Sequence, residues 1–351
     1  MHYFLRYGLR AKERKEATVD PAEFGTYVHA VLEETARDVM RRGGFHKVSL
    51  EETMEIAMNH SDAYAKERFS QLDSQRMTYL FRRNVQELSA IVEELWQEMS
   101  VSEFVPADFE LAFGDHEKME AISVPNAEME AELRGFVDRV DIWNNGYCNY
   151  FRVVDYKTGR KDFDYCDVFN GIGLQMLLYL FALEQEGENV LGDNLVPAGV
   201  QYFAARSPFV TASGKLTDEQ AAAEHGKTWK RKGLILADET VISAMEPEGS
   251  PKRLNCKFNK DGVLTGDIAS REQLKLLKKY VFGVLRNMVH DIASGDVTPN
   301  PYTRGSAHSA CSYCPYQSVC HYATVEGRRN YKTMSAQRFW EEISKEVERD
   351  G

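Results

Sequence analysis

The chain has 351 residues, of which 43% are hydrophobic and 28% are charged, a composition that is ordinary for a soluble globular protein. This length allows one large domain or two modest ones. No apolar run approaches the roughly 18 residues of a membrane-spanning helix and no signal peptide opens the chain, so we expect a cytoplasmic location and no membrane association. The formal net charge of −11 argues against a protein coated with nucleic acid, but it permits a local basic groove.

Three helices are expected in the first third of the chain. Asp20 and Pro21 match a helix start, with proline at the first helical position, and the first helix ends before Gly43 and Gly44. Its apolar residues repeat every three to four positions and form one stripe, beside which His29 lies. The expected helices cover residues 22–42, 49–72 and 75–99.

The rest of the chain alternates strand patterns with helix patterns, which indicates an α/β fold with helices on a small mixed sheet. Extended segments are expected at 108–113 and 120–124, before a hairpin over 133–157. A loop at 159–170 then leads to a helix over 172–184 and a strand over 197–206. A polar, interrupted segment over 207–261 precedes the last two helices, which are expected at 270–294 and 336–348.

The hairpin carries charged residues where strands normally carry core residues. With a period of two, Asp138 shares one strand face with apolar residues, and Asp155 and Lys157 do the same on the second strand. The Asn145–Gly146 pair predicts a two-residue turn. This turn would put Asp138 opposite Val153, with Asp155 at the diagonal position roughly 7–8 Å away. Burying such charges is unfavourable unless they pair or bind a metal.

Two carboxylates and an ammonium group at this spacing suit metal-dependent phosphodiester hydrolysis. We expect Asp138 and Asp155 to hold Mg²⁺ or Mn²⁺, which prefer oxygen ligands, with the backbone carbonyl of Tyr156 as a third ligand. The cation would activate water and neutralise charge at phosphorus, while Lys157 would stabilise the phosphate or orient the water. The alternative is a structural salt bridge of Lys157 with one carboxylate, which would leave the other carboxylate uncompensated.

The order of these residues resembles the PD-(D/E)XK nuclease superfamily, in particular its RecB-type branch, which includes AddA and AddB helicase-nuclease subunits and CRISPR adaptation exonucleases. The matching elements are G-F-V-D ending at Asp138, D-Y-K from Asp155 to Lys157, and Q-x-x-x-Y from Gln175 to Tyr179. The resemblance implies a restriction-endonuclease-like core, a small mixed sheet flanked by helices. It also implies that Gln175 and Tyr179, which share a helix face, approach the metal site or the DNA.

The resemblance adds a histidine to the expected site. In the RecB-type branch the histidine of a helical G-x-x-x-H-x-x-L-E pattern is a metal ligand, and residues 25–33 match this pattern with His29 at that position. Without the downstream motifs, a lone histidine beside an apolar stripe would more often be structural. Glu110 is a possible further acid, although its sequence context is plain.

The resemblance covers most of the chain and implies three parts. These are an N-terminal helical part over 1–105, a nuclease core over 106–300 with an insertion near 207–262, and a cysteine-bearing segment with a final helix over 301–351. The implied function is a metal-dependent DNA exonuclease of double-strand break repair and recombination, with an AddA-like helicase-nuclease as partner. The absence of a G-x-x-x-x-G-K-[ST] loop means that we expect no ATPase in this sequence. The alternatives are a DNA-binding scaffold that has lost cleavage and a CRISPR adaptation exonuclease.

Three of the six cysteines form a pattern of their own. Cys311, Cys314 and Cys320 follow the spacing C-x₂-C-x₅-C, which favours a metal centre over disulfides in a cytoplasmic chain. The pattern resembles the C-terminal part of the iron–sulfur staple of related nucleases, in which an upstream cysteine completes a [4Fe–4S] cluster. This sequence begins after the position of that cysteine, so we expect a fragment in which the cluster is incomplete or absent. Zinc, with His308 or His321 as fourth ligand, is the alternative.

Overall fold

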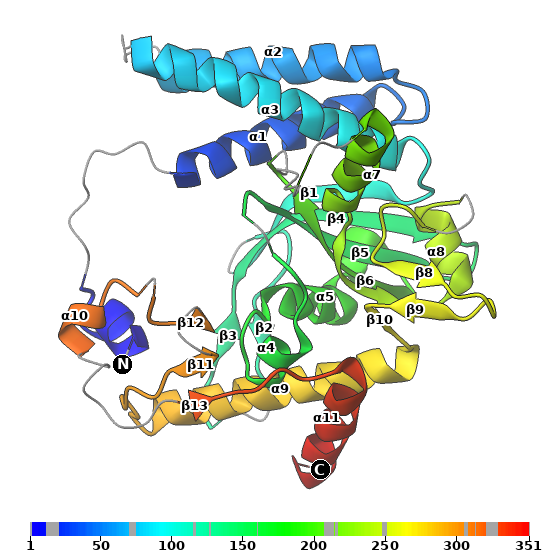
Figure 1. The fold of residues 1–351 in the computed structure, drawn as a ribbon. Coiled ribbons are helices and arrows are strands. Elements are labelled where there is room, and N and C mark those ends of the chain that lie inside the picture. The colour runs from blue at the N-terminus through cyan, green and yellow to red at the C-terminus, as the bar shows by residue number, and fades with distance from the viewer. Residues whose placement is uncertain are drawn as a thin grey trace.

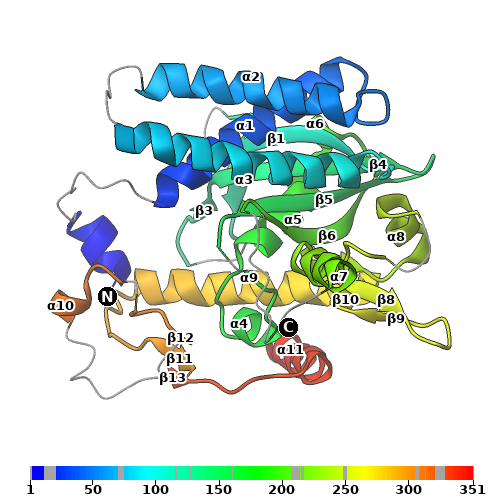
Figure 2. The same ribbon diagram turned by 45° about the horizontal axis from the view of Figure 1, so that its top comes forward.

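The computed structural model describes residues 2–11, 21–69, 75–114, 117–125, 128–159, 161–206, 214, 217–247, 251–304, 308–312, 314–320 and 329–350. In this part of the chain a central sheet is covered by helices on both faces, which gives three layers (Figures 1 and 2). None of the helices described is both long enough and apolar enough to cross a lipid bilayer.

Six strands form the central sheet in the order β1-β4-β5-β6-β7-β10. The pairs β5/β6 and β7/β10 are parallel and the other neighbours are antiparallel, so the expected mixed sheet is confirmed. Parallel β5 and β6 require a crossover connection, which contains helix α5. The six strands are β1 (Val105–Phe113), β4 (Gly135–Asn144), β5 (Asn149–Lys157), β6 (Leu195–Ala204), β7 (Lys232–Leu236) and β10 (Ile268–Ala269).

One face of the sheet is covered by α1 (Pro21–Arg41), α2 (Leu50–Phe69) and α3 (Gln75–Met99), which match the three predicted N-terminal helices (Figure 1). Apolar residues at helical spacing turn one side of each helix inward. Leu32 of α1 and Leu88 of α3 are fully buried, in one cluster with Val154 of β5. The helices α1 and α3 therefore face the sheet with their apolar stripes, and α2 packs on α1 and α3.

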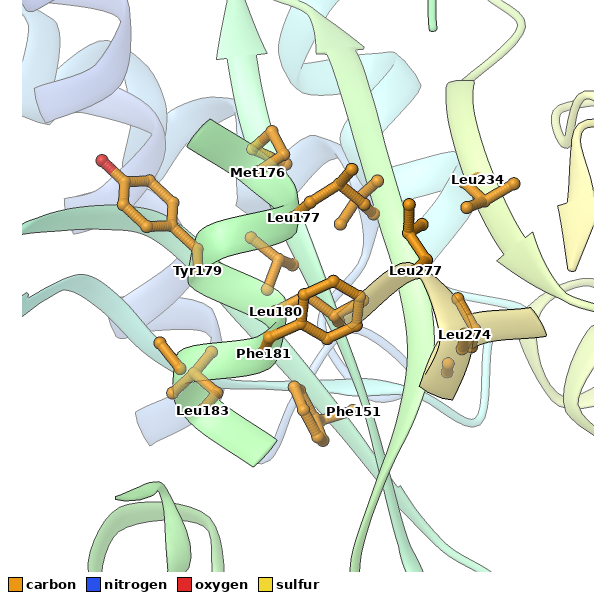
Figure 3. Close-up of a cluster of buried hydrophobic side chains, with 14 of the residues drawn as sticks. Phe151, Met176, Leu177, Tyr179, Leu180, Phe181, Leu183, Leu234, Leu274 and Leu277 are labelled. Carbon is orange, nitrogen blue, oxygen red and sulfur yellow. The ribbon is translucent and has the colours of Figure 1, made fainter. Parts of the chain in front are cut away.

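The other face is covered by α4 (Tyr165–Phe169), α5 (Gln175–Glu186), α9 (Arg271–Ala293) and α11 (Ala336–Asp350) (Figure 2). Leu177, Leu180 and Phe181 of α5 lie in the largest buried cluster, which also holds Phe151 of β5 and Leu277 of α9 (Figure 3). The predicted helices at 172–184, 270–294 and 336–348 are thus confirmed within a few residues.

The remaining described elements are short and lie around these layers. Near the N-terminus, the helical segment Phe4–Gly8 lies beside α10 (Figure 1). The short helices are α6 (Glu188–Leu191), α7 (Asp218–Thr228), α8 (Glu239–Met245) and α10 (Gln317–Cys320). The short strands are β2 (Ile122–Ser123), β3 (Glu132–Leu133), β8 (Cys256–Phe258), β9 (Leu264–Gly266), β11 (Tyr302–Arg304), β12 (His308–Ser309) and β13 (Arg329–Asn330).

The hairpin between β4 and β5 differs from the prediction in its turn. The loop spans four residues, 145–148, because the side-chain oxygen of Asn145 accepts hydrogen bonds from the backbone N–H groups of the third and fourth loop residues. The strands therefore pair two residues away from the predicted register, and Val153 lies opposite Val140 instead of Asp138. The two-residue turn was wrong, but an even shift keeps every side chain on its own face.

Two segments predicted as irregular contain regular structure. The expected loop at 159–170 includes α4, which begins after Asp164, whose side chain accepts hydrogen bonds from the N–H groups of Cys166 and Asp167. The polar segment at 207–261 contains β7, which pairs with β6 inside the central sheet. This segment therefore supplies part of the sheet as well as surface structure.

Candidate metal-binding site

The candidate site lies where β4 and β5 part. Their ladder ends at the pair Arg139–Val154, and continuing it by one residue would place Asp138 opposite Asp155. Beyond the ladder, the carboxylate of Asp138 accepts a hydrogen bond of 2.8 Å from the backbone N–H of Tyr156. A side chain thus satisfies a main-chain donor that strand pairing would otherwise satisfy.

Helix α1 brings His29 to the same opening. Its Nε2 lies 2.9 Å from the carbonyl oxygen of Tyr156. Because a carbonyl oxygen only accepts hydrogen bonds, Nε2 carries the hydrogen, and Nδ1 of the neutral ring carries the lone pair. Nδ1 lies 3.6 Å from Oδ2 of Asp138 and 3.9 Å from Oε1 of Glu110. A lone pair that faces two carboxylates is favourable only with a proton or a cation between them.

Glu110 of β1 completes this group. Its φ of 45° lies in the left-handed region, which is uncommon for residues other than glycine, and the ladder between β1 and β4 skips it. The ligand atoms of His29, Glu110 and Asp138 lie within 4.8 Å of one another. In the described part of the chain no other three such atoms from His, Cys, Asp or Glu lie this close together.

Asp155 and Lys157 form an ion pair next to this group. Nζ of Lys157 lies 2.6 Å from Oδ2 of Asp155, without the alignment of a hydrogen bond. The side chain of Asp155 is almost completely buried, whereas that of Lys157 is 36% exposed. Across the sheet, Tyr202 of β6 lies beside Asp155, and Lys232 of β7 lies beside Tyr202. One lysine, Lys232, therefore follows Asp155 along this row of the sheet.

Asp138 holds its proton more tightly than an ordinary aspartate does. Burial is the main cause that raises the pKa of Asp138 to about 6, and the charges of Asp155 and Glu110 also raise it, against the effects of His29 and the N–H of Tyr156. Burial lowers the pKa of His29, but the nearby carboxylates of Glu110 and Asp138 outweigh this effect, so the pKa is raised. Both shifts have the direction expected where positive charge is scarce.

Gln175 and Tyr179 lie beside these carboxylates. Nε2 of Gln175 donates a hydrogen bond of 2.7 Å to the hydroxyl of Tyr179. A Cβ atom at Gly135 would lie only 3.0 Å from that hydroxyl, so β4 approaches α5 closely here. Burial raises the pKa of Tyr179, and the charges of Asp138 and Asp155 raise it further. Figure 3 shows Tyr179 pointing away from the α9 side of α5.

The donor set suits a divalent cation. Two ligands of one Mg²⁺ or Mn²⁺ ion, each at about 2.1 Å, lie at most about 4.2 Å apart. The separations of Nδ1 of His29 from the oxygens of Asp138 and Glu110, 3.6 and 3.9 Å, fall within this limit. Carboxylate oxygens suit Mg²⁺ and Mn²⁺, and an imidazole nitrogen shifts the preference toward transition metals such as Mn²⁺.

A second group of charges lies on the opposite face of β4 and β5, under α3. Glu98 of α3 accepts hydrogen bonds of 2.7 Å from Arg152 and 2.8 Å from Arg231, and Asp141 accepts one of 2.8 Å from Arg152. Arg139 donates a hydrogen bond of 3.1 Å to the carboxylate of Asp141 and one of 3.0 Å to the hydroxyl of Tyr156. We call the residues Glu98, Arg139, Asp141, Arg152 and Arg231, all of them buried, the arginine network.

The cysteine segment lies against the N-terminal segment. Cys311, Cys314 and Cys320 line a cavity of about 430 Å³ together with His2. The hydroxyl of Tyr316 donates a hydrogen bond of 2.8 Å to the carbonyl oxygen of residue 11. The three sulfurs do not all lie within 4.8 Å of one another, so in the described chain they do not form a compact site for a single ion.

The sequence analysis named two histidines, His308 and His321, as alternative fourth ligands of a zinc ion in this segment. His308 lies in β12, which pairs with β11, and it does not join a compact ligand group with the cysteines in the described chain. His321 lies outside the described residues. The zinc and iron–sulfur expectations therefore both stay predictions.

Comparisons with known proteins agree with this geometry. A family model described as the PD-(D/E)XK nuclease superfamily matches residues 1–321. The chain is 33% identical over 362 aligned residues to a protein of Thermoanaerobacter sp. (strain X514) that is named as a subunit of an ATP-dependent helicase/deoxyribonuclease, and 34% identical over 349 residues to the protein of the same name from Acetivibrio thermocellus. These alignments cover 99% and 95% of this chain but 31% and 30% of the relatives, so the chain spans about a third of their length. The strand–turn–strand–helix site and the match over most of the sequence show that the chain belongs to the PD-(D/E)XK nuclease superfamily.

Proposed function

We propose that this chain is a divalent-metal-dependent deoxyribonuclease whose site is built on β1, β4, β5 and α1. The observation that carries the proposal is the convergence of His29, Glu110 and Asp138 within 4.8 Å, beside the Asp155–Lys157 pair. Members of this superfamily generally use divalent metal ions, and the relatives are named as deoxyribonuclease subunits. A bound divalent cation would supply Lewis-acid activation of water and neutralise charge at the phosphate.

Each residue of the group has its own task in this proposal. His29, Glu110 and Asp138 hold the cation, and the Nε2–H bond to Tyr156 keeps the ring of His29 in the tautomer whose Nδ1 can ligate. Asp155 is a further oxygen ligand, and the carbonyl of Tyr156 can add one because it has a second lone pair.

The cationic and hydroxyl groups around the ligands serve the substrate. Lys157, which is 36% exposed and held by Asp155, would stabilise the phosphate charge or orient the attacking water. Gln175 and Tyr179 fix the position of β4 through the close approach at Gly135, and thereby that of Asp138. Lys232, one strand beyond Tyr202, is a candidate phosphate contact.

The relatives indicate the wider setting that we propose. They are named as subunits of an ATP-dependent helicase/deoxyribonuclease. We infer that this chain acts on DNA as an exonuclease beside an AddA-like helicase-nuclease subunit, in the cytoplasm, in double-strand break repair and recombination. A [4Fe–4S] cluster in a longer form of the protein, with Cys311, Cys314 and Cys320 as three of its ligands, also belongs to this proposal.

A cleavage assay tests the proposed activity. The 351-residue chain is incubated with end-labelled single-stranded and double-stranded DNA in Mn²⁺, in Mg²⁺ and in EDTA. We expect cleavage in Mn²⁺ or Mg²⁺ that EDTA and Asp155→Ala both abolish. The matched control is Asp261→Ala, in the exposed turn between β8 and β9, which should leave cleavage unchanged.

Two outcomes would contradict the proposal. Equal cleavage by the parent chain and by Asp155→Ala would mean that the activity comes from elsewhere. Binding of DNA with no cleavage in any metal would favour a scaffold that has the fold of the superfamily without its chemistry.

A further inference from the structure

An uncovered aromatic ring lies next to the candidate metal site. Phe136 of β4 is two residues before Asp138, and 57% of its surface is exposed. Of the aromatic side chains in the described strands of the central sheet, it is the only exposed one. The neighbouring aromatic residues of these strands, such as Phe113 of β1 and Tyr156 of β5, are buried.

The structure on either side of Phe136 explains why its ring points outward. The space beside Gly135 is filled by Tyr179 and Phe113, whose nearest atoms would lie 3.0 and 3.2 Å from a Cβ atom there. Val137 is buried in the largest core cluster. Phe136 lies between these two packed positions but is itself exposed, so its ring points away from this core.

The strand opposite also leaves the ring uncovered. The residue of β1 that pairs with Phe136 is Ala112, whose single methyl group hides little of an aromatic ring. The closely packed neighbours Gly135 and Val137 fix the backbone on both sides. Phe136 is therefore a rigidly mounted, solvent-facing ring at a fixed place in the sheet.

We propose that Phe136 stacks on a nucleobase of the DNA strand whose phosphate is bound at the metal site. This inference rests on the proposed function and assigns a positioning role to a residue outside the ligand group. Two residues along a strand span about 7 Å, so the ring lies within reach of a nucleotide attached to a phosphate at Asp138. Aromatic side chains stack on bases of any sequence, and only an unpaired base offers its face. The ring therefore favours a single-stranded end.

Binding measurements with three variants test the role of the ring. They are made in an Asp155→Ala background, so that the DNA stays intact, with a fluorescent single-stranded oligonucleotide in Mn²⁺. Phe136→Ala should weaken binding about 5- to 150-fold, the range found for loss of one base-stacking contact. Phe136→Trp should restore it. The control Tyr147→Ala removes a ring that is 86% exposed, at the loop end of the same hairpin, and should change binding less than twofold.

An abasic scan adds a readout that a merely structural role would not change. A set of oligonucleotides carries one abasic position each, at successive places along the strand. The protein that keeps Phe136 should bind one of these oligonucleotides more weakly than the rest, by the same factor by which Phe136→Ala weakens binding to the intact oligonucleotide. The Phe136→Ala variant should bind all the abasic oligonucleotides equally. In the protein that keeps Asp155, the oligonucleotide with its abasic site at this same position should be cleaved with a higher KM and with little change in kcat.

The outcomes separate this inference from the proposed nuclease function. If the parent chain cleaves DNA and Phe136→Ala binds and cleaves equally well, stacking is refuted while the nuclease stands. If Phe136→Ala is weakened but the abasic scan is the same in both proteins, the ring acts through the fold and stacking is again refuted. If the parent chain does not cleave and does not bind DNA, the proposed function fails first.

Discussion

Strands β4 and β5 carry two groups of charged residues on opposite sides, and the two groups differ in how their charges are balanced. In the arginine network every carboxylate touches at least one guanidinium group, and the group is closed to solvent. At the candidate site, three carboxylates face one lysine and one histidine, and the side chain of Glu110 is 40% exposed. With His29 neutral, the site lacks two positive charges, which is the charge of one divalent cation.

This difference separates a structural use of charge from a functional one. A buried ion pair contributes when both partners are present, and removing one partner leaves an uncompensated charge. An incompletely balanced group is unfavourable until a ligand supplies the missing charge. The arginine network should therefore matter for folding, and the candidate site for metal binding.

The largest effect is expected in the arginine network. Replacing Glu98 with glutamine leaves Arg152 and Arg231 without their shared carboxylate, and should lower the free energy of unfolding by about 3–5 kcal/mol. Urea unfolding followed by circular dichroism measures this loss. Glu93→Gln, an exposed position on the same helix, should change it by less than about 0.5 kcal/mol. Equal stability of the two variants would show that the network is not a folding element.

The next effect is a change of the free energy of unfolding with pH in metal-free buffer. The folded protein holds a proton on Asp138 up to about pH 6, whereas the unfolded chain releases it near pH 4, so the folded state binds more protons between these values. This contribution to stability is complete below about pH 4 and is lost as the pH rises through 6. The raised pKa of His29 acts in the same direction at higher pH.

Asp138→Asn should remove the part of this pH dependence of stability that is due to the carboxyl group of Asp138. Relative to that of the parent chain, the free energy of unfolding of the variant should rise by up to about 3 kcal/mol between pH 4 and pH 7 in EDTA. Excess Mn²⁺ should abolish this gain, because the parent chain then has the cation that the variant binds poorly. If the free energies of unfolding of the two proteins differ by an amount that does not change with pH, Asp138 is not buried among other acids.

The smallest effect is expected from one ligand of the cation. Glu110→Gln keeps the shape of the side chain but removes a charged ligand, and should weaken Mn²⁺ binding at least about tenfold in calorimetric titrations with the metal alone. Glu120→Gln, an exposed position in the same region, is the control and should bind Mn²⁺ like the parent chain. Unchanged affinity in Glu110→Gln would remove Glu110 from the ligand set. Mn²⁺ should also bind more tightly than Mg²⁺, because His29 contributes a nitrogen ligand.

Local sequence patterns predicted the helices, the hairpin and the strand at 197–206 well, because each depends on apolar spacing within one element. They also placed His29, Asp138, Asp155 and Lys157 on elements that the fold brings together, although their roles as ligands are still predictions. The hairpin register was wrong because the side chain of Asn145 stabilises a longer loop, a choice that the Asn-Gly pair alone does not reveal.

What the sequence could not show depends on contacts between distant elements. Glu110 was ranked low because its place beside His29 follows from a positive φ and a skipped ladder position, and neither leaves a pattern in the residues around it. The pairing of Glu98 with Arg231 joins residues 133 positions apart. Strand β7 was missed because its pattern is short and lies within a long polar segment.

Tyr156 belongs to both groups of charges through different atoms. Its hydroxyl contacts Arg139, whereas its backbone N–H and carbonyl hold Asp138 and His29. Every residue except proline supplies both a backbone N–H and a carbonyl. The scaffold that aligns these two side chains is therefore insulated from every point mutation at position 156 except a change to proline. The other changes would alter the interior of the protein before they altered the candidate metal-binding end of the strand.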